Sequence, residues 1–210
     1  LFRERPESRK EFPRLAALAP LYGAGLISKE QMKAQVLRAF ARIPATEQAQ
    51  VLDAFHEREL RPRYLKGALE RIAWHRKRGH RLVLASASVE LYLDRVARAL
   101  HFDELIATRT ALENGPTEQG DGHLDGLLRS ALSSGTPRLK GANCYGEEKV
   151  RRLQAWEDFD DIDWPGSWAY SDHVSDLPML MLCGHPVATR PERRLQRHAL
   201  AQGWRIMRWT

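Results

Sequence analysis

The chain has 210 residues, of which 43% are hydrophobic and 29% charged, and this is the balance of an ordinary globular protein with a hydrophobic core. No apolar run approaches the roughly 18 residues that a membrane-spanning helix needs, and no positively charged start followed by an apolar run marks a secretion signal, so we expect no membrane partner. The two cysteines, Cys144 and Cys183, are too few for a disulfide framework, and we expect a reduced, cytoplasmic protein.

Charge is distributed unevenly along the chain, although the net value is only +6. Residues 1–81 carry a net charge of +9, residues 82–185 carry −8, and residues 186–210 carry +5. The basic residues alternate with acidic ones at helical spacing, which is typical of solvated helix faces and not of a nucleic-acid interface. We therefore expect no nucleic-acid partner and interpret the basic residues as a solvated surface; the alternative is a basic lobe that attracts anionic small molecules toward an acidic, metal-holding lobe.

The first 60 residues predict helices and no strand. Ser28 and Gln31 form a capping box ahead of residues 31–43, where apolar side chains recur every three or four positions. Thr46 is placed to cap a second helix over residues 47–60.

Beyond residue 60 the pattern changes to an alternation of amphipathic helices and short apolar runs. Helices are expected at residues 62–80, 89–102, 147–156, 176–184 and 191–203. Strands are expected at residues 81–86, 104–109, 167–171 and 186–189, with an edge strand at 204–209. The alternation predicts an α/β fold, in which helices flank a Rossmann-like parallel sheet.

The predicted organisation is a helical unit, residues 1–60, followed by an α/β core, residues 61–210. Residues 111–142 are rich in Gly, Ser and Thr and interrupt the alternation. We expect an irregular excursion there, with a hairpin at residues 120–126.

Polar side chains follow two of the predicted strands at their carboxyl ends, where parallel sheets bind ligands. The first strand ends in Ser86, and the strand at 167–171 is followed by Asp172 and then Asp176. Lys149 lies in the first turn of a predicted helix, with Lys140 as the alternative.

These residue types suit phosphoryl transfer. A hydroxyl holds phosphate oxygens, a lysine neutralises charge on the transferring group, and carboxylates hold Mg²⁺. Taken singly, a serine or aspartate at such a position is more commonly a helix cap. Their joint placement at one sheet edge favours a site.

Three segments carry a family resemblance: "LVLASASVELYLDRVARALHFDELIATR", "GANCYGEEKVRRL" and "YSDHVSDLPMLMLCGHPVAT". They are similar to motifs II, III and IV of the phosphoserine-phosphatase-like branch (subfamily IB) of the haloacid dehalogenase superfamily. The resemblance covers residues 60–210, and the helical first 60 residues are similar to the cap of that branch. The third segment is the most specific, because a strand, a DxxxD pair and Leu-Pro-Met occur together.

The resemblance implies a role for each candidate residue. Ser86 would bind the phosphoryl group, and Lys149 would be the motif III lysine, although in phosphoserine phosphatases proper that lysine falls nearer the position of Tyr145. Asp172 would ligate Mg²⁺, and Asp176 would support the metal site through its water shell. The implied activity is that of a Mg²⁺-dependent phosphomonoesterase acting on a small phosphorylated metabolite.

Members of this family attack phosphorus with an aspartate in a DxDxT motif at the end of the first, central strand, and we find no such motif ahead of the helical segment. Residues 158–164, "DFDDIDW", have the spacing but follow an amphipathic helix, so we interpret them as a solvated acidic loop. The chain is then either an incomplete copy or a natural pseudo-enzyme that binds an anionic ligand or a protein partner. We favour the first, because each buried ladder group left unpaired beside an absent central strand costs about 1–3 kcal/mol.

Overall fold

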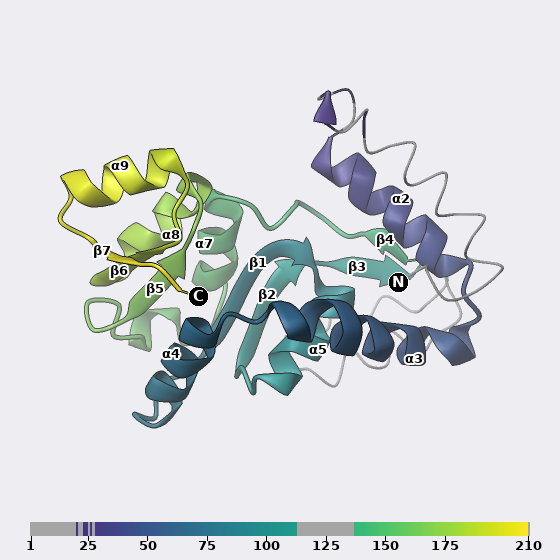
Figure 1. The fold of residues 1–210 in the computed structure, drawn as a ribbon, viewed down its shortest axis with the longest axis horizontal. Helices are drawn as coiled ribbons and strands as arrows, with labels where there is room; N and C mark the ends of the chain where they lie inside the picture. Colours follow the sequence, from purple (N-terminus) through teal and green to yellow (C-terminus); the bar gives the residue numbers. More distant parts are fainter. Residues whose placement is uncertain (1–19, 21–22, 25, 27, 113–136, 210) are drawn as a thin grey trace.

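The computed structural model of the chain describes residues 20, 23–24, 26, 28–112 and 137–209. Figure 1 shows helices and strands alternating along most of that length. The helices are α2 (Lys29–Ala41), α3 (Ala45–Phe55), α4 (Lys66–Arg76), α5 (Glu90–Ala99), α7 (Glu147–Gln154), α8 (Leu177–Leu182) and α9 (Arg193–Ala201). The strands are β1 (Val83–Val89), β2 (Glu104–Thr108), β3 (Thr110–Leu112), β4 (Pro137–Leu139), β5 (Trp168–Ser171), β6 (His185–Thr189) and β7 (Arg205–Met207).

The helices that precede β1 begin and end largely for local reasons. Ser28 caps α2 through the predicted capping box: its side chain accepts from Gln31 N–H, and the Gln31 side chain accepts from Ser28 N–H. The prediction that Thr46 caps the second helix is wrong. Helix α3 already begins at Ala45, because the carbonyl of Pro44 accepts the first helical N–H groups.

The predicted boundary at residue 60 lies inside a continuous helical run. A π-helical turn (His56–Leu60) and a 3-10 turn (Arg61–Arg63) follow α3 directly, so that α4 begins only at Lys66. Helix α4 is followed by Gly79, whose φ of +70° is readily adopted by glycine. The division into a helical unit and an α/β core stays a prediction.

The sheet topology confirms the α/β class but not a single continuous sheet. Strands β1 and β2 pair in parallel, and β5, β6 and β7 form a second parallel sheet in that order, with β7 at its edge as predicted. Within the described part of the chain, no ladder joins β1 to β5. Strands β3 and β4 pair antiparallel at the two ends of the predicted excursion, residues 111–142, whose expected hairpin at 120–126 lies outside the described residues.

Hydrophobic packing joins these pieces. Helices α2 and α3 pack Phe40 and Leu52 against α5. A second cluster joins β5 and β6 to α8 and α9 around Leu180 and Leu195. A third joins β1 and β2 to α7 and α8 around Leu153, so α8, which belongs to the second and third clusters, bridges the two parallel sheets. In Figure 1, β1 and β2 accordingly lie between the α2–α3 end of the molecule and the end formed by β5, β6 and β7.

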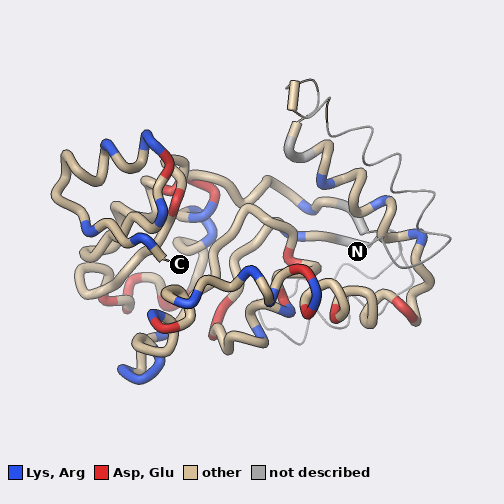
Figure 2. Tube along the Cα trace, in the orientation of Figure 1, with Lys and Arg blue, Asp and Glu red and all other residues tan. Residues whose placement is uncertain are grey.

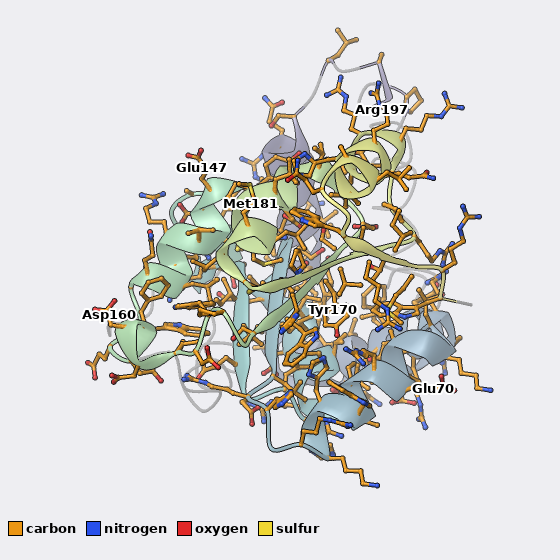
Figure 3. All side chains as sticks on the ribbon, turned by 90° about the vertical axis from the view of Figure 1, so that its left-hand side faces the viewer. Glu70, Glu147, Asp160, Tyr170, Met181 and Arg197 are labelled. Atoms are coloured by element: carbon orange, nitrogen blue, oxygen red, sulfur yellow. The ribbon has the colours of Figure 1, made fainter. Side chains whose placement is uncertain are left out.

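A cluster of aromatic and histidine side chains attaches helix α4 to β5. His75 Nε2 lies 2.7 Å from the Tyr170 hydroxyl, and His75 Nδ1 lies 2.8 Å from Nδ1 of His80. The ring of Trp168 stacks on the rings of both His80 and His185. Figure 3 shows Tyr170 on the β5 side of this junction, above α4.

His75 is the titratable centre of this junction. Burial lowers the pKa of His75 to about 4, and the positive charges of Arg71 and Arg78 and the neighbouring His80 act in the same direction. The unfolded chain therefore binds more protons than the folded protein between pH 6.5 and about 4. His75 contributes stability above pH 6.5 that is lost as the pH falls through this window.

We predict that the free energy of unfolding falls between pH 6.5 and 4, and that His75→Gln makes this fall shallower because the glutamine does not titrate. Urea unfolding at several pH values measures both slopes. Identical slopes in the two proteins would contradict the prediction.

Candidate active site

The end of β5 carries the carboxylates that the sequence singled out. Ser171, the last residue of the strand, is buried, and Asp172 follows it in an exposed position. A short 3-10 turn, Val174–Asp176, then folds the chain back, so that Asp176 Oδ2 accepts a hydrogen bond from Ser171 Oγ at 2.7 Å. The two aspartates therefore differ in environment: one is available to solvent and the other is held inside.

The inner carboxylate forms an ion pair with the predicted lysine. Lys149 Nζ lies 2.7 Å from Asp176 Oδ1, and the two side chains are only 6% and 11% exposed. Helix α7 reaches this position because Gly146, the residue just before it, adopts a φ of +59°, which residues other than glycine rarely adopt. Lys140, the alternative lysine, is exposed, which favours Lys149.

Strand β1 is irregular where it carries Ser86. Ala85 pairs with Ile106 and Val89 pairs with Thr108, so four residue steps on β1 match two on β2. Such a bulge bends the strand and re-aims its side chains. Ser86 therefore lies within the bulge and not at the strand end that the sequence predicted.

The hydroxyl of Ser86 is held by its own turn. Ser86 Oγ accepts a hydrogen bond from the backbone N–H of Ser88 at 3.1 Å. This bond uses one acceptor position of the oxygen and leaves its proton available as a donor.

The structure thus joins Lys149 and Ser171 to the same carboxylate, that of Asp176, and places Ser86 in the bulge of β1 and Asp172 directly after β5. Helix α7 packs on β2 and on the 3-10 turn after β5, so it connects the β1–β2 sheet to that turn. Figure 2 shows lysines and arginines along α4 and α9, at the end of the molecule where the second sheet lies. The catalytic roles of the four predicted residues stay predictions.

Several polar residues of this edge were not singled out by sequence reasoning. Three of them lie in segments whose pattern did predict strands or helices: Thr108 and Ser171 end strands β2 and β5, and Asn143 precedes α7. Lys33, on α2, reaches the same edge from a distant helix, and no motif signals it.

Two further residues near this edge have structural roles. Cys144 is completely buried, and burial raises the pKa of its thiol, so it acts as a small packing residue and not as a nucleophile. His173 caps the 3-10 turn by accepting from Ser175 N–H at 3.1 Å, in line with a residue at a helix start.

The donor set fits Mg²⁺ only as part of a larger shell. Asp172 offers an exposed carboxylate, and the described residues contain no group of three or more His, Cys, Asp or Glu side chains placed to hold a metal. Mg²⁺ usually keeps several waters and binds through one or two carboxylates plus phosphate oxygens. Asp172 therefore fits as one ligand, while Asp176 is already engaged by Lys149 and Ser171.

Sequence comparison gives a family match. A family model described as haloacid dehalogenase-like hydrolase matches residues 1–181. A probable phosphatase of Mycobacterium tuberculosis is 30% identical over 143 residues, which are 68% of this chain and 43% of that protein. A histidinol-phosphatase of Neisseria meningitidis is 30% identical over 136 residues, covering 63% of this chain and 54% of the relative. The chain spans about half the length of these relatives.

Structure comparison agrees with the fold. A Bordetella pertussis protein of unknown function superposes with a TM-score of 0.71 at 25% identity, covering 98% of this chain and 84% of that chain. A probable phosphoserine phosphatase of Vibrio cholerae gives a TM-score of 0.60 at 17% identity, covering 93% of this chain and 52% of that chain. No helix within the described residues is both long and apolar enough to cross a membrane.

The buried ion pair generates a stability prediction. Replacing Lys149 with Met, or Asp176 with Asn, leaves one buried partner without its opposite charge and should lower the free energy of unfolding by about 3 kcal/mol. Chemical denaturation measures the loss. Lys66→Met breaks the exposed Lys66–Glu70 pair and serves as the matched control, with little change expected. Equal effects at the two sites would contradict a buried, structurally coupled Lys149.

Proposed function

The chain belongs to the haloacid dehalogenase-like hydrolase family, and on that premise we propose that it is a Mg²⁺-dependent phosphomonoesterase that hydrolyses a small phosphorylated metabolite. The observation that carries the proposal is the buried Lys149–Asp176 pair, in which Asp176 lies four residues along the same turn from the exposed Asp172. Relatives described as phosphatases support it.

Each described residue has a defined task in this proposal. The Ser86 hydroxyl donates a hydrogen bond to a phosphoryl oxygen. Its own oxygen is already held in the bulge, because it accepts a hydrogen bond from Ser88 N–H. Lys149 supplies a positive charge to the transferring group, and Asp176 holds that ammonium in one orientation. A preorganised charge of this kind stabilises developing negative charge without reorganisation during the reaction.

Asp172 would hold the metal. Mg²⁺, when bound, neutralises charge on the phosphoryl oxygens and helps to align the group for in-line attack. Asp172 is suited to this task because its carboxylate is exposed while its backbone is fixed, with the carbonyl accepting from Glu192 N–H at 2.8 Å.

We propose that the attacking carboxylate lies on a strand that pairs with both β1 and β5. The lack of a ladder between these two strands in the described residues supports this position. The carboxylate oxygen would bond to phosphorus as the ester oxygen leaves with a proton from a general acid, and water would then attack phosphorus to release phosphate and regenerate the carboxylate.

Residues 158–164 do not provide that carboxylate. Asp160, Asp161 and Asp163 are exposed, and Asp158 forms an ion pair with Arg81. The segment includes a 3-10 turn, Phe159–Asp161, and no strand. This agrees with its interpretation as a solvated acidic loop.

The position of the nucleophile is tested by reading the nucleotide sequence upstream of the codon for Leu1. We expect an open frame that encodes an apolar strand and a DxDxT motif. A stop codon in that frame would contradict the proposed strand and favour a non-catalytic, anion-binding protein.

The metal assignment is tested in protein that carries the nucleophile. Asp172→Asn should lower Mg²⁺-dependent hydrolysis of p-nitrophenyl phosphate by about a hundredfold or more, because the carboxylate that anchors the ion is lost. Asp160→Asn removes an exposed carboxylate from the acidic loop and serves as the control (Figure 3). Near-normal turnover in Asp172→Asn would contradict the assignment.

A further inference from the structure

A lysine from helix α2 contacts the bulge that carries Ser86. The ammonium of Lys33 donates hydrogen bonds to the backbone carbonyl of Ala87 and to Oδ1 of Asn143, and it lies 3.4 Å from Oγ1 of Thr108. These partners are 54 to 110 positions away from Lys33 in the sequence. The contact therefore joins three separate parts of the fold: α2, the carboxyl end of the β1–β2 sheet, and the loop before α7.

The hydroxyl of Thr108 donates to the same two oxygens that accept from Lys33. Thr108 Oγ1 lies 2.7 Å from the carbonyl oxygen of Ala87 and 2.8 Å from Oδ1 of Asn143, and it accepts from Cys144 N–H at 3.2 Å. Thr108 is completely buried. Hydrogen bonds to a charged group are stronger than neutral ones, so the ammonium of Lys33 adds the strongest single attraction to this network.

We propose that Lys33 is a positioning residue of the phosphate site: it holds the Ala87 carbonyl, and thereby the bulge that aims the Ser86 hydroxyl. This inference rests on the proposed function of Ser86. Ala87 follows Ser86 directly and lies inside the irregular segment between Ala85 and Val89. Binding of its carbonyl by two side chains fixes the peptide next to Ser86.

The position of Lys33 is itself fixed by packing. Helix α2 buries Leu37, Ala39 and Phe40, and its cluster includes Leu91 and Tyr92 of α5, the helix that follows β1. A movement of α2 away from the core would withdraw the ammonium from Ala87. Lys33 therefore makes the geometry of the phosphate site depend on the position of the N-terminal helices.

A double-mutant cycle on the full protein tests whether Lys33 acts through Ser86. Inorganic phosphate is titrated in the presence of Mg²⁺ into the wild type, Lys33→Met, Ser86→Ala and the combined variant. We expect Lys33→Met to weaken phosphate binding about tenfold, by the loss of a charged hydrogen bond, and to have little further effect once Ser86 is alanine. A full additional loss in the Ser86→Ala background would overturn the proposal, because Lys33 would then act on the ligand independently of Ser86.

Arg38→Met is the matched control, since Arg38 is an exposed basic residue on the same helix. It should leave phosphate binding unchanged. A weakening equal to that of Lys33→Met would overturn the proposal in favour of a general effect of the positive charge of α2.

A second measurement does not depend on phosphate binding. The Ser88 amide donates to Ser86 Oγ, so its hydrogen exchange reports directly on the bulge. We expect faster exchange at Ser88 in Lys33→Met but not in Arg38→Met, with the amides of β6 unchanged in both. Unchanged exchange at Ser88 would overturn the positioning role. A wild type that fails to bind phosphate would instead contradict the proposed function and leave this readout to decide the role of Lys33.

Discussion

The buried pair of Lys149 and Asp176 is the interaction on which the rest of the site depends. It joins the first turn of α7 to the turn that follows β5, and Ser171 Oγ donates a hydrogen bond to the second oxygen of the same carboxylate. An ammonium and a carboxylate are stable together at this depth only while each has the other, so removal of one partner is costly. The pair fixes α7, and α7 in turn packs on β2, the neighbour of the strand that carries Ser86.

The topology explains why chemically useful groups gather at this edge. Parallel strands end on the same side of a sheet, and the irregular backbone after each strand has free polar groups to offer. Two devices refine that general arrangement here. The bulge in β1 moves Ser86 out of the regular ladder, and the short 3-10 turn after β5 separates an exposed Asp172 from a buried Asp176.

The two parallel sheets are held together by side chains and helices, not by a ladder within the described residues. Helix α8 packs against both, α7 packs against β2 and the turn after β5, and the His75–Tyr170 contact fastens α4 to β5. Hydrophobic packing can hold two separate sheets together because hydrophobic contact is not directional, whereas backbone hydrogen bonds need the strands to lie side by side. The same division supports the position proposed for the strand that delivers the nucleophile.

The sequence by itself determined the features that depend on near neighbours. The Ser28 capping box, the helical period of α2, the alternation that defines the α/β class and the DxxxD spacing after β5 are all local patterns, and the structure contains each of them. The Thr46 cap is one local prediction that is wrong, because α3 begins at Ala45 and the Pro44 carbonyl accepts its first helical N–H groups. Only the tertiary structure decided the bulge at Ser86, the burial that depresses the pKa of His75, and the contact of Lys33 with Ala87. These depend on which distant residues pack together, and a contact across 54 positions of chain leaves no periodic trace in the sequence.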